Sequence, residues 1–552
     1  VGDGIFADTD GALYYLNEHD PYKNFMETSF QMNHNLSVSG GTDKLRYRMS
    51  AGYVSTDGVL ITDKDTYERL NINSYISADI TKWFTQELTM SYARTNQSQP
   101  NSGLGSMFGS NQVSYQPEGN MPSDVCSTIS QDLPFNTPRN QVLLANKWKK
   151  SYDNPRVFVK SILKPFKGFE AVFEYTFDKN MYDYNFYTGK TQYTDIQGGN
   201  NIWNAAKDYL QKEKQFTDYN AFNIYGTYKF DLNKDHHFSV MAGFNQESKY
   251  TEGVNVLSYN QAVVEVPALG SGTGDLKATD SYNEYSVRGG FFRVNYNYMD
   301  KYLLEVNGRY DGSSKFPKDS RFGFFPSVSA AWRISAEPFM EPFSGVLSNL
   351  KLRTSWGRAG TDNIGQFQYM SAYGTGGDAV FGGQNPEIAP GYTETRFPNP
   401  NITWETSEMF NIGIDASFFN GKLNLEADWF YKKTNDILRE RTDMPAILGY
   451  KLPAANVGKV DNRGIDLNIT HRNHLRDFNY SIAGNLTWAR NKVIDLLEPA
   501  GEKNNPRQRS TGHSMSQYFG YEALGLFQSD EEANNWPQPQ FGKAKAGDIK
   551  YK

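Results

Sequence analysis

The chain consists of segments in which apolar and polar residues alternate, and these segments are joined by short and long links in turn. Alternation with a period of two is typical of β-strands that have one apolar and one polar face. The short links have only a few residues, whereas the long links are 55–66, 97–155, 179–215, 249–281, 358–401, 433–456 and 491–517. Strands joined by trimmed turns at one end and large loops at the other are typical of an outer-membrane β-barrel.

The patterning predicts an all-β chain with about 17 antiparallel strands. Their expected ranges are 32–39, 44–54, 67–80, 85–96, 156–164, 168–178, 216–230, 237–248, 283–298, 302–311, 321–334, 350–358, 402–419, 422–433, 456–471, 477–490 and 517–528. Many exceed the roughly 9–11 residues that cross a bilayer at a tilt, so the surplus is expected to project on the long-loop side.

The expected organisation has three parts. Residues 1–31 lead into the barrel, residues 32–528 form its wall, and residues 529–552 begin a further extracellular loop. Bacterial single-chain barrels normally have an even number of strands. About 17 strands is an odd number, so the predicted strands alone are not expected to close the wall. We therefore expect the closing strands to lie outside this sequence, which would make the chain a fragment.

Composition agrees with a barrel wall and excludes several other classes. Hydrophobic residues make up only 38% of the chain, yet aromatic residues reach 15%, as a wall with aromatic girdles requires. No apolar run approaches the roughly 20 residues of a transmembrane helix. The net charge of −6, without a basic cluster, gives no sign of nucleic-acid binding. The single Cys126 lies in a long link and cannot form an internal disulfide.

The two faces of the wall can be assigned from the free-energy cost of placing a charged side chain in lipid. A Lys or Arg on the lipid side at mid-membrane costs about 2–4 kcal/mol. Tyr47, Met49, Leu70 and Ile72 are therefore expected to face lipid. The side chains expected to face the lumen are those of Arg46, Arg48, Arg69, Asp79 and Asp466.

Several motifs, taken together and in order, resemble those of the SusC/RagA-type TonB-dependent transporters. The central signature is the run Asp311-Gly312-Ser313-Ser314, followed by the pair Trp332-Arg333. Further matches lie in 67–73, 352–360, 399–405, 456–464, 520–528 and 547–549. The resemblance spans nearly the whole chain.

This resemblance implies a barrel of 22 strands with an N-terminal plug and a SusD-like lipoprotein as an external lid. It implies a place in the outer membrane of a Gram-negative bacterium. Import of an oligosaccharide or an oligopeptide would be driven by the TonB-ExbB-ExbD complex, acting through an N-terminal region that this sequence does not contain. No enzyme chemistry and no cofactor are expected.

Aromatic side chains in the expected loops are the candidates for substrate contact, because sugar rings and peptide side chains both pack on aromatic faces. The candidates are Trp203, Tyr209, Tyr369, Tyr373, Phe381 and Trp404. The alternative is that these rings pack the loops against one another or against a lid.

Other motifs favour ordinary structural roles. The run from Asp311 lacks the glycine spacing of a phosphate-binding loop. The pairs His236-His237 and His471 with His474 fall at expected turns and lack a third metal ligand nearby, so no metal site is expected. Two other functions stay open: a siderophore or cobalamin receptor, and a secreted glycan-binding β-sandwich protein.

Overall fold

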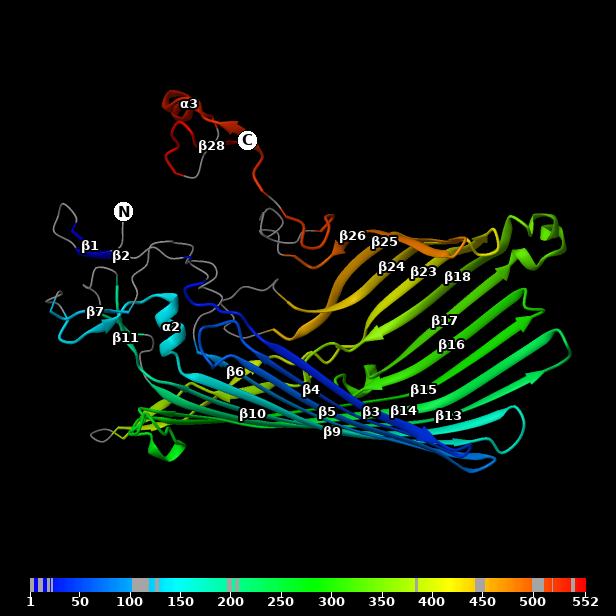
Figure 1. The fold of residues 1–552 in the computed structure, drawn as a ribbon, viewed down its shortest axis with the longest axis horizontal. Coiled ribbons are helices and arrows are strands. Elements are labelled where there is room, and N and C mark those ends of the chain that lie inside the picture. Colours follow the sequence, from blue (N-terminus) through cyan, green and yellow to red (C-terminus); the bar gives the residue numbers. More distant parts are fainter. Residues whose placement is uncertain are drawn as a thin grey trace. The chain divides into compact units, whose positions relative to one another are not determined.

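The computed structural model describes residues 4–7, 13–16, 20, 23–101, 119–124, 129–195, 201–203, 208–382, 386–441, 452–498, 511–518, 520–537 and 542–552. Its main element is one antiparallel sheet of 16 strands (Figure 1). In sheet order these are β3 (Gln31–Gly41), β4 (Leu45–Asp57), β5 (Thr66–Thr81), β6 (Phe84–Pro100), β9 (Lys147–Leu163), β10 (Phe169–Thr188), β13 (Tyr209–Asp231), β14 (His236–Tyr259), β15 (Leu276–Tyr298), β16 (Tyr302–Ser313), β17 (Phe322–Arg333), β18 (Leu347–Thr361), β23 (Glu405–Phe418), β24 (Leu423–Glu440), β25 (Ala454–Leu475) and β26 (Phe478–Asp495). The all-β meander predicted from the sequence is confirmed.

The segment 517–528, expected as a seventeenth wall strand, does not join the main sheet. Only Ala523–Leu526 is a strand there (β27), and it pairs with β28 (Ile549–Tyr551) in a separate two-stranded sheet. The helix α3 (Asp530–Asn535) lies between these two strands in the chain. The prediction of a wall strand is therefore wrong, because a short apolar segment can pair with any available edge.

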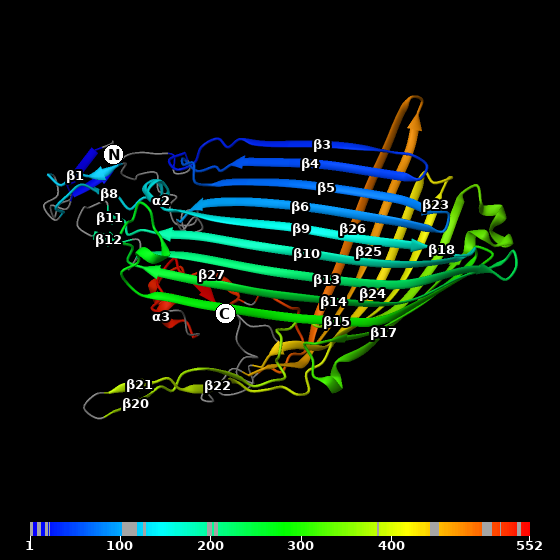
Figure 2. The ribbon, with the colours of Figure 1, turned by 90° about the horizontal axis from the view of Figure 1, so that it is seen from below.

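Contacts divide the chain into two compact units. The first comprises Val1–Tyr228 and Met241–Gly290, and the second comprises Lys229–Val240 and Phe291–Lys552. In the first unit, β3, β4, β5, β6, β9 and β10 run side by side (Figure 2). Tyr47 lies opposite Ile76 there, and Ile72 lies opposite Tyr92, so apolar side chains share one face.

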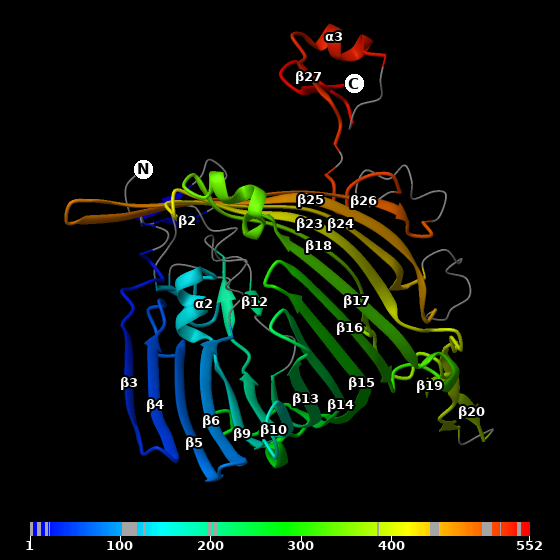
Figure 3. The same ribbon diagram turned by 90° about the vertical axis from the view of Figure 1, so that its right-hand side faces the viewer.

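The second unit repeats this alternation. Its strands β16 to β18 and β23 to β26 are neighbours in the sheet (Figure 3). One row across it joins Ile412, Trp429, Ile465 and Trp488 on one face. We call this side of each unit the apolar face and the opposite side the polar face.

Small clusters pack the long-loop ends of the strands. In the first unit, α2 (Pro138–Leu144) starts at the N-cap Thr137, and its Val142 is buried against Phe25 and Leu60. The second unit has a buried cluster of Phe316, Ile402, Trp404 and Ala454. None of the helices in the described ranges is long and apolar enough to cross a membrane.

Candidate functional site

The charged residues predicted to face the lumen lie together on the polar faces. Arg46 and Asp79 form an ion pair of 3.5 Å, and Arg69 Nε donates to Asn71 Oδ1 at 2.9 Å. The strand alternation places Arg48 on the same face as these residues. In the second unit, Asp466 lies opposite Asp428 in the register. That this side faces the lumen stays a prediction, but along β4 and β5 these charged side chains do lie on the face opposite to Tyr47 and Ile72.

The polar face of the first unit carries a row of aromatic rings near the long-loop ends of its strands. The alternation in β10 points Tyr182, Tyr184 and Phe186 to this side, and successive ring centroids are 6.4 Å and 6.0 Å apart. Three further rings join them from β9 and β13. The aromatic row, as we use the term, comprises Trp148, Tyr152, Tyr182, Tyr184, Phe186 and Tyr209.

The ring planes of this row determine what it can bind. Tyr182 and Tyr184 are parallel within 9°, as are Tyr184 and Phe186, whereas Tyr152 is tilted by 36° against Tyr182. Side chains in alternate positions of a strand stand about 7 Å apart, which places the rings as a ladder along β10. Tyr182 and Tyr184 are half-buried and could contact a ligand that itself has repeating units, whereas Phe186 is buried and supports the end of the ladder.

The side chain of Lys150 lies over this row. Lys150 Nζ stands 4.7 Å from the ring centre of Trp148 and 5.3 Å from that of Tyr184. Aromatic faces attract a cation through the negative potential above the ring. Glu213 lies opposite Tyr184 in the register, so the row combines stacking surface with a cation and a carboxylate that could orient a polar ligand.

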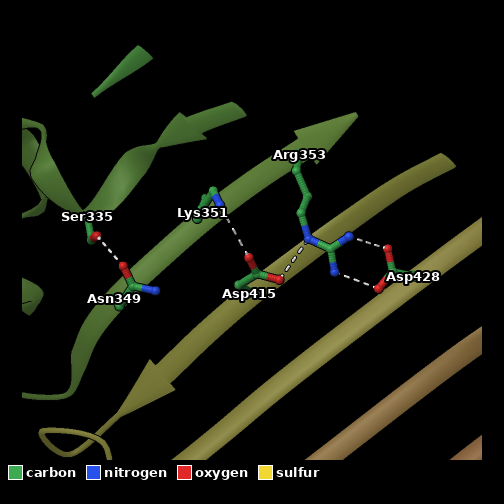
Figure 4. Close-up of polar contacts among 6 residues, drawn as sticks. All are labelled: Ser335, Asn349, Lys351, Arg353, Asp415 and Asp428. Atoms are coloured by element: carbon green, nitrogen blue, oxygen red, sulfur yellow. Dashed lines mark hydrogen bonds and ion pairs between the residues drawn. The ribbon is translucent and has the colours of Figure 1, made fainter. Parts of the chain in front are cut away.

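A network of charges occupies the polar face of the second unit (Figure 4). Arg353 on β18 donates from Nη1 and Nη2 to the two oxygens of Asp428, both at 2.6 Å, and from Nε to Asp415 at 2.9 Å. Lys351 lies 3.8 Å from the other oxygen of Asp415. Bidentate pairing of this kind fixes both partners in one geometry.

Gly413 makes the network possible. It lies between Arg353 and Asp428 in the register of β18, β23 and β24. A Cβ atom at Gly413 would collide with the carboxylate of Asp428 and the guanidinium of Arg353. The absence of a side chain lets the charges meet across the intervening strand.

A cavity of about 390 Å³ adjoins this network. Polar side chains from several strands line it, including Glu305, Ser329, Arg353, Ser355 and Asn411. Its charged groups are largely paired within the protein, so the cavity offers few uncompensated charges to a ligand.

The signature residues have structural roles. Asp311 forms an ion pair with Arg309 at 2.8 Å, and Ser313 Oγ donates to Asp362 Oδ2 at 2.6 Å. After Gly312 and Ser314, the chain buries Phe316 in the cluster at the long-loop end. The run from Asp311 therefore stabilises the end of β16, in agreement with the ordinary structural role expected for it.

The second signature pair fastens a turn at the other end of the sheet. Trp332 Nε1 donates to Glu337 Oε1 at 3.0 Å, and Arg333 Nη1 donates to the carbonyl oxygen of Asp300 at 3.3 Å. Glu337 also accepts from Tyr302 at 2.8 Å and from Lys301 at 3.2 Å. Hydrogen bonds from Trp332 and Tyr302 lower the pKa of the Glu337 carboxyl.

The loop aromatics predicted to contact substrate do not form one group. Trp404 is buried and donates from Nε1 to the carbonyl oxygen of Arg321, and Tyr369 packs beside it. Tyr373 and Phe381 are 68% and 63% exposed. Tyr209 alone belongs to the aromatic row. Trp203 has its backbone in β12 (Asn201–Trp203), but its side chain lies outside the described residues.

Five of the six rings of the aromatic row were missed because they fell within the expected loops 97–155 and 179–215. The signal was present in the sequence: Tyr182, Tyr184 and Phe186 alternate with polar residues. A strand that continues beyond the bilayer has water on both sides, so its alternation no longer contrasts lipid with lumen.

The turn histidines have partners within the protein. His236 Nδ1 lies 2.9 Å from the Tyr296 hydroxyl, and His237 Nδ1 lies 2.6 Å from Asp231 Oδ1. His471 Nε2 is 3.1 Å from the Tyr480 hydroxyl. Across the described residues, no group of three or more metal-ligating side chains is found. Cys126 lies outside the described residues.

Comparisons with known proteins agree with this architecture. The chain is 28% identical over 538 residues to the TonB-dependent receptor P3 of Formosa agariphila, covering 92% of this chain and 50% of that protein. It is 26% identical over 544 residues to the TonB-dependent receptor SusC of Bacteroides thetaiotaomicron, covering 90% and 52%. The chain thus spans about half the length of these curated relatives.

A solved structure described as the RagAB peptide transporter shares the fold, with a TM-score of 0.77 at 20% identity over 93% of this chain and 56% of that one. The family described as "TonB dependent receptor-like, beta-barrel" matches residues 127–546. The chain therefore belongs to this family of receptor barrels and lies in the outer membrane of Gram-negative bacteria.

Proposed function

We propose that this chain forms the wall of a receptor that actively imports an oligomeric nutrient, an oligosaccharide or an oligopeptide. The aromatic row carries this proposal. Its rings repeat along β10 on the polar face, and Lys150 adds one charge among them. An oligomer can engage several rings at once, whereas a compact ligand can engage only one or two.

The energy source and the seal are part of the same proposal. A barrel of this size would leave a wide aqueous lumen unless it is filled, so a plug must close it. TonB, with ExbB and ExbD, would move that plug through an N-terminal region of the receptor. The polar faces would then line the path that opens, and the chain would carry out no bond chemistry.

A surface lipoprotein of the SusD type is the proposed partner. The link between β18 and β23 carries two hairpins, β19 (Ala372–Thr375) with β22 (Tyr392–Arg396) and β20 (Ala379–Phe381) with β21 (Glu387–Ala389). Large apolar side chains on these hairpins are strongly exposed, namely Tyr373, Val380, Phe381, Ile388 and Tyr392. Exposed apolar groups of this density are typical of interaction surfaces.

Uptake of labelled oligomers by cells tests the main proposal. Tyr182→Ala combined with Tyr184→Ala should lower uptake by at least about tenfold, because each lost stacking contact is worth about 1 kcal/mol. Tyr175→Ala removes a ring from the opposite face of the same strand and should leave uptake unchanged. Equal uptake by both variants would contradict the proposal. Uptake confined to ferric chelates or cobalamin would replace it with the alternative receptor function.

Purification in mild detergent tests the partner. The receptor should bring down a lipoprotein in comparable amount, and Phe381→Ser with Tyr392→Ser should release it. Lys432→Ser with Lys433→Ser serves as the control, because it changes two residues of a wall strand away from the hairpins. Repeated recovery of the receptor alone would argue against a lid.

A further inference from the structure

A cavity of about 510 Å³ lies at the long-loop ends of β24, β25 and β26 in the second unit. The register aligns Tyr431, Arg463 and Arg490 in one row across these strands, and it aligns Asp461 with Lys492 in the next row. The chain folds back to close one side, with Ser514 Oγ donating to the carbonyl oxygen of Asn491 at 2.9 Å.

This cavity opens on the apolar face. In the row next to the arginine row on the same face, two residues away along each strand, lie Trp429, Ile465 and Trp488, which are 41%, 48% and 53% exposed. Two residues along a strand correspond to about 7 Å. The cationic side chains therefore stand just beyond an aromatic and aliphatic belt, at the depth where a bilayer presents its headgroups.

The charges of the cavity are unbalanced. Arg463, Arg490 and Lys492 supply three cations, and Asp461 supplies one carboxylate. That carboxylate is already engaged, because the Tyr431 hydroxyl donates to Asp461 Oδ2 at 2.6 Å. The three cationic side chains form no hydrogen bond or ion pair with another described residue.

We propose that this cavity binds a phosphate group of an anionic lipid in the outer leaflet, with Arg463 and Arg490 as its main ligands. Guanidinium groups suit phosphate because they donate in a planar fork. The acyl chains of the same lipid would lie along Ile465 and Trp488. The lipid is favoured over a soluble anion because the cavity continues the membrane-facing surface.

Native mass spectrometry of the receptor purified from membranes tests this inference. Diphosphorylated lipid A should bind at least about tenfold more tightly than the same lipid without phosphates, since each basic residue near a membrane contributes about 1 kcal/mol. Arg463→Gln with Arg490→Gln should abolish this preference. Arg472→Gln removes a cation from the opposite face of β25 and should keep it.

Two further arms make the result decisive. Arg463→Lys with Arg490→Lys retains the charge and should retain most of the preference, even if the glutamine pair assembles poorly. Inorganic phosphate alone should bind at least about a hundredfold more weakly than the phosphorylated lipid. Equal binding of the lipids with and without phosphates, or inorganic phosphate binding as tightly as the lipid, would overturn the proposal.

Discussion

The aromatic row of the first unit and the Arg353 network of the second occupy the polar faces of their units but are built from opposite chemistry. The row contains three parallel rings on β10 with three tilted rings beside them, and Lys150 lies over two of the six; Tyr152 is exposed, whereas Phe186 is buried. In the network, Arg353 is held by the carboxylates of Asp415 and Asp428. Apolar rings can contact ligands of varied shape. In the network, by contrast, the cations and carboxylates already pair with each other and leave few charges for a ligand.

This difference suggests different roles for the two groups: ligand binding for the aromatic row and stabilisation of the wall for the Arg353 network. Replacing the ion pairs of Arg353 with Asp415 and Asp428 by contacts to a ligand would gain little free energy. We therefore assign the network a role in stabilising the wall. The rings of the row lose nothing when a ligand covers them and gain contact area. We therefore expect the first unit to supply more of the binding energy and the network to supply more of the rigidity.

The largest expected effect tests whether the two faces are assigned correctly. Met49→Arg places a charge on the apolar face and should cost about 2–4 kcal/mol if the site lies near mid-membrane. Ser50→Arg, one residue along β4, places the same charge on the polar face and should be tolerated. The folded fraction after assembly in outer membranes measures both. Equal assembly would remove the basis of the comparison.

The next effect concerns the supporting network. Arg353→Met leaves Asp415 and Asp428 without their shared cation and should lower the free energy of unfolding by about 2 kcal/mol, less than for a fully buried pair. Lys351→Met removes a weak contact and should change it by less than about 0.5 kcal/mol. Urea unfolding in lipid vesicles gives both values. Adding Asp428→Asn to Arg353→Met should recover part of the loss.

A pH dependence is expected at the turn beside the network. Because hydrogen bonds lower the pKa of Glu337 in the folded state, its stabilising effect is present above the ordinary pKa of 4.5 and is lost as the pH falls through the folded value. Glu337→Gln should lower Tm at pH 7, and the difference from the wild type should shrink below pH 4.5. Thermal unfolding followed by circular dichroism at several pH values measures this. A constant difference would argue against the linkage.

The smallest expected effect concerns the contribution of Lys150 to ligand affinity at the aromatic row. Lys150→Met removes the cation over Trp148 and Tyr184, which is worth about 0.5–1 kcal/mol to a bound acidic group. Affinity for an acidic peptide should fall about threefold, whereas affinity for a neutral oligosaccharide should change less. Lys149→Met lies on the opposite face and is the matched control. Isothermal titration with both ligand types compares them, and an equal effect of the two substitutions would contradict the assigned role.

The sequence predicted the wall well wherever lipid lies on one side. In 44–54, Tyr47 and Met49 alternate with charged residues, and β4 contains the predicted strand with the predicted alternation. Strand ends were harder to predict. β9 begins at Lys147, within the expected loop 97–155. The sequence did not reveal this start, because Lys147 to Asn154 carries polar residues on both faces beside Trp148 and Tyr152. Alternation carries information only where the two surroundings differ.

The candidate site was less predictable than the wall. Sequence reasoning identified Tyr209, but it could not show that this ring meets Phe186, which comes from another strand at a centroid distance of 5.6 Å. It also named Trp404 among the loop aromatics that could contact substrate or pack the loops, and the structure shows that this side chain is buried. Burial of a loop residue depends on segments far away in the chain, such as Phe316, and local composition does not contain that information.

The sequence by itself determined the strand periodicity, the alternation of charged and apolar residues within strands such as β4, and the resemblance to the family, because each depends on the order of neighbouring residues. Only the tertiary structure decided which rings form the aromatic row, that Gly413 lets Arg353 reach Asp428, and that Ala523–Leu526 pairs outside the main sheet. These features depend on strand register, and register is set by pairing between distant segments.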